Sequence, residues 1–177
     1  MELISKIIEI LIEIDNNIHQ AILKTHRPWL TKSMTILTHF GSSTVWSIIY
    51  LILFIVIKNK VGGLLVILIF AELLGLLIII CLKHLTKRER PSKNLAVRII
   101  DPWNRYSFPS LHSARVFMIA TVMGVACPKW WGYMISIAIL IGFSRLYLAK
   151  HYLSDVLTGA LTGICSALIS LYFFNFF

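Results

Sequence analysis

Residues 144–155, SRLYLAKHYLSD, place a histidine and an aspartate four positions apart beside a hydrophobic run. On a helix this spacing puts His151 and Asp155 on one face, so the carboxylate can hold one imidazole nitrogen and leave the other free to attack. Arg145 lies six positions before His151, so it must reach across the helix or the helix must break between them. The stretch predicts an oriented nucleophile. A solvated turn beside the membrane is the alternative, because His-x-x-x-Asp pairs are common on helices.

A second polar stretch, residues 83–90, follows a long apolar run and reads KHLTKRER. If the helix continues until Pro91 stops it, Lys83 and Arg90 lie two turns apart on one side, at a separation of about 10 Å, with Lys87 between them. Such a face could clamp an anion. It could also be a cationic rim that contacts lipid headgroups.

The third polar stretch, residues 108–113, reads FPSLHS and precedes another apolar run. Pro109 fixes a turn, Ser110 is a natural N-cap, and the first-turn amides of the helix that follows suit a phosphate. His112 would lie beside that anion and could donate a proton to a leaving oxygen. The structural alternative leaves Ser110 as a cap only and His112 as a polar residue between helices. Arg115, three residues further on, could order His112 or contact a second polar group of the substrate.

The composition is that of an integral membrane protein: 177 residues, 58% hydrophobic and 14% charged, with a mean hydropathy of +0.80. This length allows one domain, residues 1–177, of about five or six spans of about 20 residues each, and excludes a large soluble domain. The formal charge of +9 suits anionic lipid better than nucleic acid, because most of the chain would lie in the bilayer. Three single cysteines, which lack metal-ligand spacing, are expected to be packing residues: Cys81, Cys127 and Cys165.

The apolar runs predict an all-α bundle of about five transmembrane helices over residues 34–176, preceded by an amphipathic interfacial helix over residues 1–24. Counting spans places the end of the second, the start of the third and the connection between the fourth and fifth on one side of the membrane. Those are the three polar stretches described above, so we expect them to share one site. The expected spans are 34–57, 64–82, 110–127, 133–147 and 153–176.

Two features inside the spans predict how the helices pack. Glu72 lies in the middle of the second span, so its carboxyl should face the bundle interior in a structural role, protonated or bonded to a hydroxyl. Gly159 and Gly163 form a small-xxx-small pair in the fifth span, which would permit a close helix approach. The hydroxyl partners expected for Glu72 are Ser136, Thr162 and Ser166.

The three polar stretches together resemble the type 2 phosphatidic acid phosphatase family, whose pattern is K-x6-R-P, then P-S-G-H, then S-R-x5-H-x3-D. The departure is Leu111, which stands where the family usually has glycine and puts the fine geometry and the substrate choice in question. The resemblance implies the membrane branch of this family. The matching residues are Lys83, Arg90, Pro91, Pro109, Ser110, His112, Ser144, Arg145, His151 and Asp155.

The resemblance also implies a role for each matching side chain. His151 would attack phosphorus and form a phosphohistidine, Asp155 would orient it, and His112 would protonate the leaving lipid oxygen and then activate water. It implies no metal and no cofactor, and the sequence contains no carboxylate cluster suited to magnesium. The phosphoryl oxygens would be held by Lys83, Arg90, Ser110 and Arg145. Further candidate substrate contacts are Lys87, Arg98, Arg105 and Arg115.

Small bacterial members of this family act on envelope lipids, so the resemblance implies hydrolysis of a lipid phosphate monoester or pyrophosphate. Lipid A 1-phosphate is favoured, because short connections leave room for a bulky headgroup. Undecaprenyl pyrophosphate, phosphatidylglycerol phosphate and a lipid phosphotransferase activity are alternatives. An anionic lipid-binding membrane protein without catalysis is the alternative from another class.

The distribution of charges conflicts with the family's usual orientation. The positive-inside rule would place the basic end of the chain in the cytoplasm. Bacterial relatives usually face the periplasm, and a site for anionic headgroups recruits cations of its own. We therefore expect a protein of the bacterial inner membrane whose site faces the periplasm. Four cations are left out of this count because they are assigned to the site or to a span interior: Lys83, Arg90, Arg115 and Arg145. The remaining cations at the site end are Lys6, Lys24, Arg27, Lys32, Lys87, Arg88, Lys93, Arg98, Arg105 and Lys150. Those at the other end are Lys58, Lys60 and Lys129.

Overall fold

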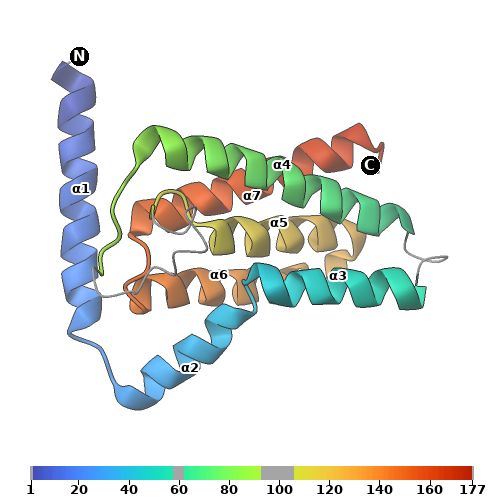
Figure 1. Cartoon of the computed structure of the whole chain (residues 1–177), viewed down its shortest axis with the longest axis horizontal. Helices are drawn as coiled ribbons and strands as arrows, with labels where there is room; N and C mark the ends of the chain where they lie inside the picture. The colour runs from blue at the N-terminus through green and yellow to red at the C-terminus, as the bar shows by residue number, and fades with distance from the viewer. Residues whose placement is uncertain (1, 58–61, 93–105, 177) are drawn as a thin grey trace.

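The predicted all-α architecture is confirmed in a computed structural model that describes residues 2–57, 62–92 and 106–176. Within these residues there are seven α-helices and one short 3₁₀ turn, and no strand (Figure 1). The elements are α1 (Glu2–Leu23), α2 (Pro28–His39), α3 (Ser43–Ile57), α4 (Gly62–Thr86), α5 (Leu111–Ala126), η2 (Pro128–Trp130), α6 (Trp131–Tyr147) and α7 (Leu153–Phe173).

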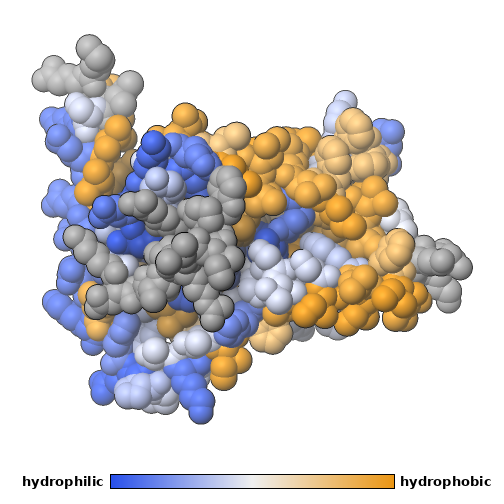
Figure 2. Space-filling view, in the orientation of Figure 1, coloured by the Kyte–Doolittle hydropathy of each residue, from blue (hydrophilic) through white to orange (hydrophobic). Residues whose placement is uncertain are grey.

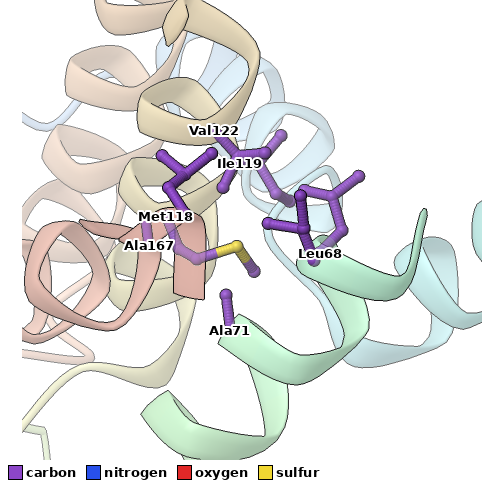
Figure 3. Close-up of a cluster of buried hydrophobic side chains, with 8 residues drawn as sticks. Leu68, Ala71, Met118, Ile119, Val122 and Ala167 are labelled. Carbon is purple, nitrogen blue, oxygen red and sulfur yellow. The ribbon is translucent and has the colours of Figure 1, made fainter. Parts of the chain in front are cut away.

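Helix α5 is the centre of the bundle and contacts α4, α6 and α7. The close approach of α5 and α7 depends on glycine. A Cβ added at Gly163 would lie 2.0 Å from the Ala114 carbonyl oxygen, and one at Gly159 would lie 2.4 Å from that of Ser110. The predicted small-residue packing of α7 is thus confirmed. The core between α4, α5 and α7 consists of Ile67, Leu68, Ala71, Met118, Ile119, Val122, Ala167 and Leu171 (Figure 3).

By length and composition, α4 and α7 can each cross a membrane, and α2 with α3 can form a third span that is bent by 44°. Helix α5 is apolar but shorter, with 16 residues. The first span was expected to be continuous over residues 34–57, and that expectation is wrong. The chain breaks at residues 40–42 instead, where Gly41 meets α5 and α6.

Helix α1 lies across one end of the bundle, as an interfacial helix should (Figure 1). Its apolar side chains Ile7, Ile8, Leu11 and Ile14 are exposed within the chain. Hydrophilic residues gather at this end of the molecule, whereas hydrophobic residues cover the bundle (Figure 2). A bilayer around the bundle would therefore end near α1, at headgroup depth.

The predicted helical extension up to Pro91 is wrong, because α4 ends at Thr86. Lys87 has a φ of 46°, a left-handed conformation that interrupts the helix. The following backbone is held by Ser107, whose N–H donates to the Arg88 carbonyl over 2.8 Å. Lys83 and Arg90 consequently do not share a helical face. Arg88 instead reaches Asp155 in the first turn of α7, and Arg90 reaches the Lys150 carbonyl between α6 and α7.

Candidate active site

The three polar stretches meet at a cavity of about 440 Å³ near the α1 end of the bundle. The stretch 83–90 contributes Lys83 and Arg90, the stretch 108–113 contributes His112, and the stretch 144–155 contributes Arg145 and His151. The prediction that these segments converge is confirmed. The full lining is Ser42, Ser43, Thr44, Leu76, Ile79, Ile80, Lys83, Arg90, Leu111, His112, Arg145 and His151.

His151 lies in the turn before α7 and not on a helix. The chain turns there because the Arg145 carbonyl accepts the N–H groups of Lys150 and His151, over 3.1 and 3.3 Å. The break between Arg145 and His151, one of two predicted solutions, lets both side chains line the same cavity.

Asp155 lies beside the His151 ring, with 3.6 Å between Nδ1 of His151 and Oδ2 of the carboxylate. That distance exceeds a normal hydrogen bond, and His151 Nδ1 has no hydrogen-bond partner within the described ranges. The carboxylate itself is fixed: Oδ2 accepts the Tyr152 N–H over 2.8 Å, and Oδ1 accepts from Arg88 Nη1 over 2.9 Å. A shift of a few tenths of an ångström would join the imidazole to an already oriented carboxylate.

Three cations surround the other face of the imidazole. Arg90 donates to the Lys150 carbonyl over 2.9 Å, and its Nη1 lies 3.4 Å from His151 Nε2. Lys83 Nζ donates to the Tyr106 carbonyl over 2.7 Å. Arg145 is 4% exposed and donates to Thr38 Oγ1 over 2.7 Å, while its Nε has no hydrogen-bond partner among residues 2–57, 62–92 and 106–176. A buried guanidinium nitrogen without an acceptor is costly, so this corner of the cavity suits an anion.

The same cations lower the pKa of His151. Burial, together with the positive charges of Arg145, Arg90 and Lys83, holds the pKa of His151 well below its ordinary value of 6.5. The imidazole is therefore neutral at physiological pH. Only the neutral ring has the lone pair that a nucleophile needs.

Ser110 and His112 differ in their placement. Ser110 is fully buried and caps α5, because its Oγ accepts from the Ser113 N–H over 3.4 Å and the Ser113 hydroxyl over 3.0 Å. It does not line the cavity, and the structure shows its capping role, while the predicted contact with phosphate stays a prediction. Its N–H donates to the Asp155 carbonyl over 3.0 Å, which joins α5 to the start of α7. His112 does line the cavity.

Arg115 is buried and does not line the cavity. Its Nε and Nη2 donate to Glu72 Oε1 over 2.8 and 2.5 Å, and its Nη1 donates to the Gly41 carbonyl over 2.8 Å. The expected substrate contact stays a prediction. Arg115 is a structural link between α4, α5 and the break before α3. Glu72 pairs with this arginine and not with a hydroxyl, because an ion pair offsets the burial of both charges.

Gly41, whose carbonyl Arg115 holds, packs against the His112 side chain. A Cβ added there would lie 3.1 Å from His112 Cδ2 and 3.0 Å from Ile141 Cγ2. We expect Gly41→Ala to displace the His112 ring and to lower kcat about tenfold, since small misplacements of reacting groups have effects of this order. Gly132→Ala is the matched control, because nothing lies within 4 Å of its added Cβ. Steady-state kinetics on both variants check this; equal activities would show that the ring position does not depend on Gly41.

Of the remaining predicted contacts, only Lys87 lies among the described residues. Lys87 is exposed and does not line the cavity. Arg98 and Arg105 lie outside the described residues. Sequence reasoning missed the partners of the site residues, above all Arg88 on Asp155 and Thr38 on Arg145. Had residues 88–90 been expected to be extended, their R-x-R spacing would have placed Arg88 and Arg90 on one face, but no sequence signal relates Thr38 to Arg145.

No three His, Cys, Asp or Glu side chains in the described ranges gather as metal ligands. The predicted independence from metal is a separate statement about the reaction and stays a prediction. The groups that the structure brings together at the cavity are two imidazoles, two guanidinium groups and one ammonium.

Fold and site define a helical membrane protein with a cationic, histidine-containing cavity at one end of its bundle. The chain belongs to the PAP2 superfamily, whose profile matches residues 60–177. It is 31% identical over 169 residues to phosphatidylglycerophosphatase B of Bacillus subtilis, covering 85% of this chain and 78% of that protein. It is 27% identical over 133 residues to the undecaprenyl-diphosphatase of Sulfolobus acidocaldarius, covering 73% of this chain and 64% of that protein.

Two solved structures have the same fold. LpxE of Aquifex aeolicus superposes with a TM-score of 0.71 at 32% identity, covering 88% of this chain and 93% of that one. A PAP2-type phosphatidylglycerolphosphate phosphatase of Bacillus subtilis superposes with a TM-score of 0.74 at 27% identity, covering 91% and 84%. The expected family membership and membrane fold are thereby confirmed.

Proposed function

We propose that this chain hydrolyses the phosphate monoester or pyrophosphate of a membrane lipid. The observation that carries the proposal is the cavity in which His151 and His112 meet Lys83, Arg90 and Arg145. Relatives that act on phosphatidylglycerophosphate and undecaprenyl diphosphate support the same class of substrate. Phosphoryl transfer depends mainly on positioning and on stabilisation of charge, and this cavity supplies both.

In the proposed reaction, His151 Nε2 attacks phosphorus, the bond to the leaving oxygen breaks, and a phosphohistidine forms. Asp155 stabilises the positive charge that develops on the ring. His112 gives its proton to the leaving oxygen and then takes one from the attacking water, which releases phosphate and restores the free imidazole. The cations neutralise the equatorial phosphoryl oxygens. No step requires a metal.

The apolar part of the cavity indicates where the lipid would lie. Leu76, Ile79 and Ile80 of α4 continue the lining from Lys83 toward the bundle interior. Leu111, which replaces the usual glycine, adds an apolar wall beside His112. A phosphate at the cations would therefore have its hydrocarbon portion directed along α4.

Two substrates are favoured by particular relatives. Phosphatidylglycerol phosphate is supported by the similarity to phosphatidylglycerophosphatase B of Bacillus subtilis and to the solved structure of a phosphatidylglycerolphosphate phosphatase. Lipid A 1-phosphate, the substrate favoured from sequence, is supported by the similarity to LpxE. The test is phosphate release by purified protein, with chelator, from these two lipids and undecaprenyl pyrophosphate in parallel. Release from none of them, with binding retained, would leave the binding-protein alternative.

Free phosphate formed without an acceptor also separates hydrolysis from phosphotransfer. A phosphotransferase would retain the phosphoryl group until an acceptor hydroxyl arrived. We propose hydrolysis, because the cavity that holds His112 is large enough for water beside a bound phosphate. Consumption of the lipid phosphate that depends on an added alcohol and yields the phosphorylated alcohol in place of free phosphate would contradict this.

The lowered pKa of His151 predicts a pH dependence. The nucleophile stays neutral, and therefore active, until the pH falls well below 6.5, so the acid limb of kcat/KM should lie below that value. Lys83→Met removes one positive charge, which raises the pKa of His151 and moves the limb to higher pH. The profile is measured with kcat/KM expressed per substrate dianion. A limb at or above 6.5 in the wild type would contradict the proposed state of the ring.

We further propose that the protein resides in the inner membrane with the cavity facing the periplasm. The polar end that holds α1 and the cavity must lie at one membrane surface. A cysteine at exposed Lys24, in a variant without the native cysteines, tests the side. Labelling by an impermeant thiol reagent in intact spheroplasts supports the periplasm; protection would support the cytoplasmic side that the positive-inside rule favours.

A further inference from the structure

Asp15 is a buried carboxylate in a helix that otherwise exposes its polar residues. It is 2% exposed, whereas Glu9 and Glu13 of the same helix are exposed. Burying a carboxylate is unfavourable unless partners hold it. Its partners are not in α1. They lie at the start of α7, just after His151, and in the segment that follows α4 and carries Arg90.

The first partner is Ser154, in the first turn of α7. Its N–H donates to Asp15 Oδ1 over 2.9 Å, and its hydroxyl donates to Asp15 Oδ2. The first N–H groups of a helix lack partners within the helix, and a negative charge is favourable there. Asp15, a residue of another helix, thus caps the N-terminus of α7 at Ser154, the residue before Asp155.

The second partner is Arg88, which joins Asp15 to Asp155. Its Nη2 lies 2.7 Å from Asp15 Oδ2, and its Nη1 lies 2.9 Å from Asp155 Oδ1. Nη1 also donates to Ser154 Oγ over 2.6 Å, and the guanidinium lies 4.2 Å from the centre of the Tyr152 ring. A single guanidinium therefore bridges two buried carboxylates, one of which lies against His151.

Asp15 is not needed merely to attach α1. The segment after α1 is held separately by Tyr147, whose carbonyl lies 2.6 Å from His26 Nε2 and whose hydroxyl accepts the Arg27 N–H over 2.9 Å. The His26 and Tyr147 rings also stack, with centroids 4.5 Å apart. Loss of Asp15 should therefore release Arg88, whose side chain is 24% exposed and can turn toward water, while α1 stays in place.

We propose that Asp15 is a positioning residue for the phosphohistidine chemistry: it holds Arg88 and the first turn of α7 so that the Asp155 carboxylate stays against His151. This inference rests on the proposed function of His151 and Asp155. It makes the interfacial helix part of the site and not only a membrane contact.

The test compares Asp15→Asn, Arg88→Met and the double variant, with Glu13→Gln as the matched control on the exposed side of α1. Asp15→Asn keeps the shape of the side chain and removes its charge. We expect kcat to fall about tenfold with KM changed less than about twofold, because the effect reaches the chemical step through orientation. In the Arg88→Met background, Asp15→Asn should lower kcat by clearly less than in the wild type, because only the contact of Asp15 with Ser154 then remains to be lost. Unchanged kcat in Asp15→Asn, or independent effects that multiply in the double variant, would overturn the proposal.

A second measurement does not depend on turnover. In protein labelled with ¹⁵N-histidine, the His151 ring resonances, assigned with His151→Ala, should shift in Asp15→Asn and in Arg88→Met but not in Glu13→Gln. Unshifted resonances would overturn the positioning role even if the enzyme is active. If the wild type released no phosphate while the shifts appeared, the proposed function would fail and the positioning of Asp155 by Asp15 would stand.

Discussion

His151→Ala is expected to lower phosphate release from the lipid substrate by at least about 10⁴-fold, since loss of a covalent nucleophile has effects of this size. The ring is 3% exposed and lines the cavity, and burial together with nearby cations, which would also bind phosphate, holds its pKa well below 6.5. No other residue in that lining combines a neutral nitrogen nucleophile with an adjacent carboxylate. The measurement is initial rates on purified variants at saturating lipid in mixed micelles.

His84→Ala is the matched control for this substitution. His84 is exposed near the end of α4, its Nδ1 lies 2.8 Å from the Ile80 carbonyl, and it is absent from the cavity lining. Its removal should leave activity within about twofold of wild type, since surface substitutions have small effects. Substantial turnover by His151→Ala would show that the phosphoryl group does not pass through this residue.

His112→Asn is expected to lower the hydrolysis of a lipid phosphate by about 10³-fold, within the usual range for general acid–base catalysis. Its effect on the first step should depend on the leaving group. A lipid alkoxide needs a proton as it leaves, whereas p-nitrophenolate does not. The variant should therefore release p-nitrophenol from p-nitrophenyl phosphate in a rapid burst of about one equivalent and then turn over slowly, because water activation also needs His112.

Stopped-flow measurement of the burst separates these two roles. With the lipid substrate the burst should disappear, and with p-nitrophenyl phosphate its rate should stay within about tenfold of wild type. An equal loss of the burst rate for both leaving groups would assign His112 to binding and not to proton transfer.

The sequence predicted the residues that line the cavity better than the side chains that hold those residues in place. Lys83, Arg90, His112, Arg145 and His151 converge because helix order alone places their segments at one end. Motif spacing also located the break between Arg145 and His151 as one of two solutions. The sequence left two roles open for Ser110, because a serine that precedes a helix can either cap it or bind an anion and both uses have the same sequence pattern. The structure shows the cap, and the contact with phosphate stays a prediction.

The errors arise where tertiary contacts override local pattern. Lys87 ends α4 in a left-handed conformation that its residue type does not indicate, so the face predicted for residues 83–90 does not form. The Glu72–Arg115 and Asp15–Arg88 pairs join residues 43 and 73 positions apart. No periodicity in one sequence relates such residues. Each pair offsets the burial of two charges, so it decides local geometry that propensity leaves open.

The central claim is a covalent phosphohistidine at His151. The most direct measurement is rapid quenching of the His112→Asn protein after mixing with ³²P-labelled p-nitrophenyl phosphate, followed by proteolysis and identification of the labelled peptide. Slow hydrolysis in this variant should let the intermediate accumulate to about one equivalent, stable in base, labile in acid, located on His151 and absent from the His112→Asn, His151→Ala double variant. Label on another residue, or full turnover with no labelled protein at any quench time, would contradict the account.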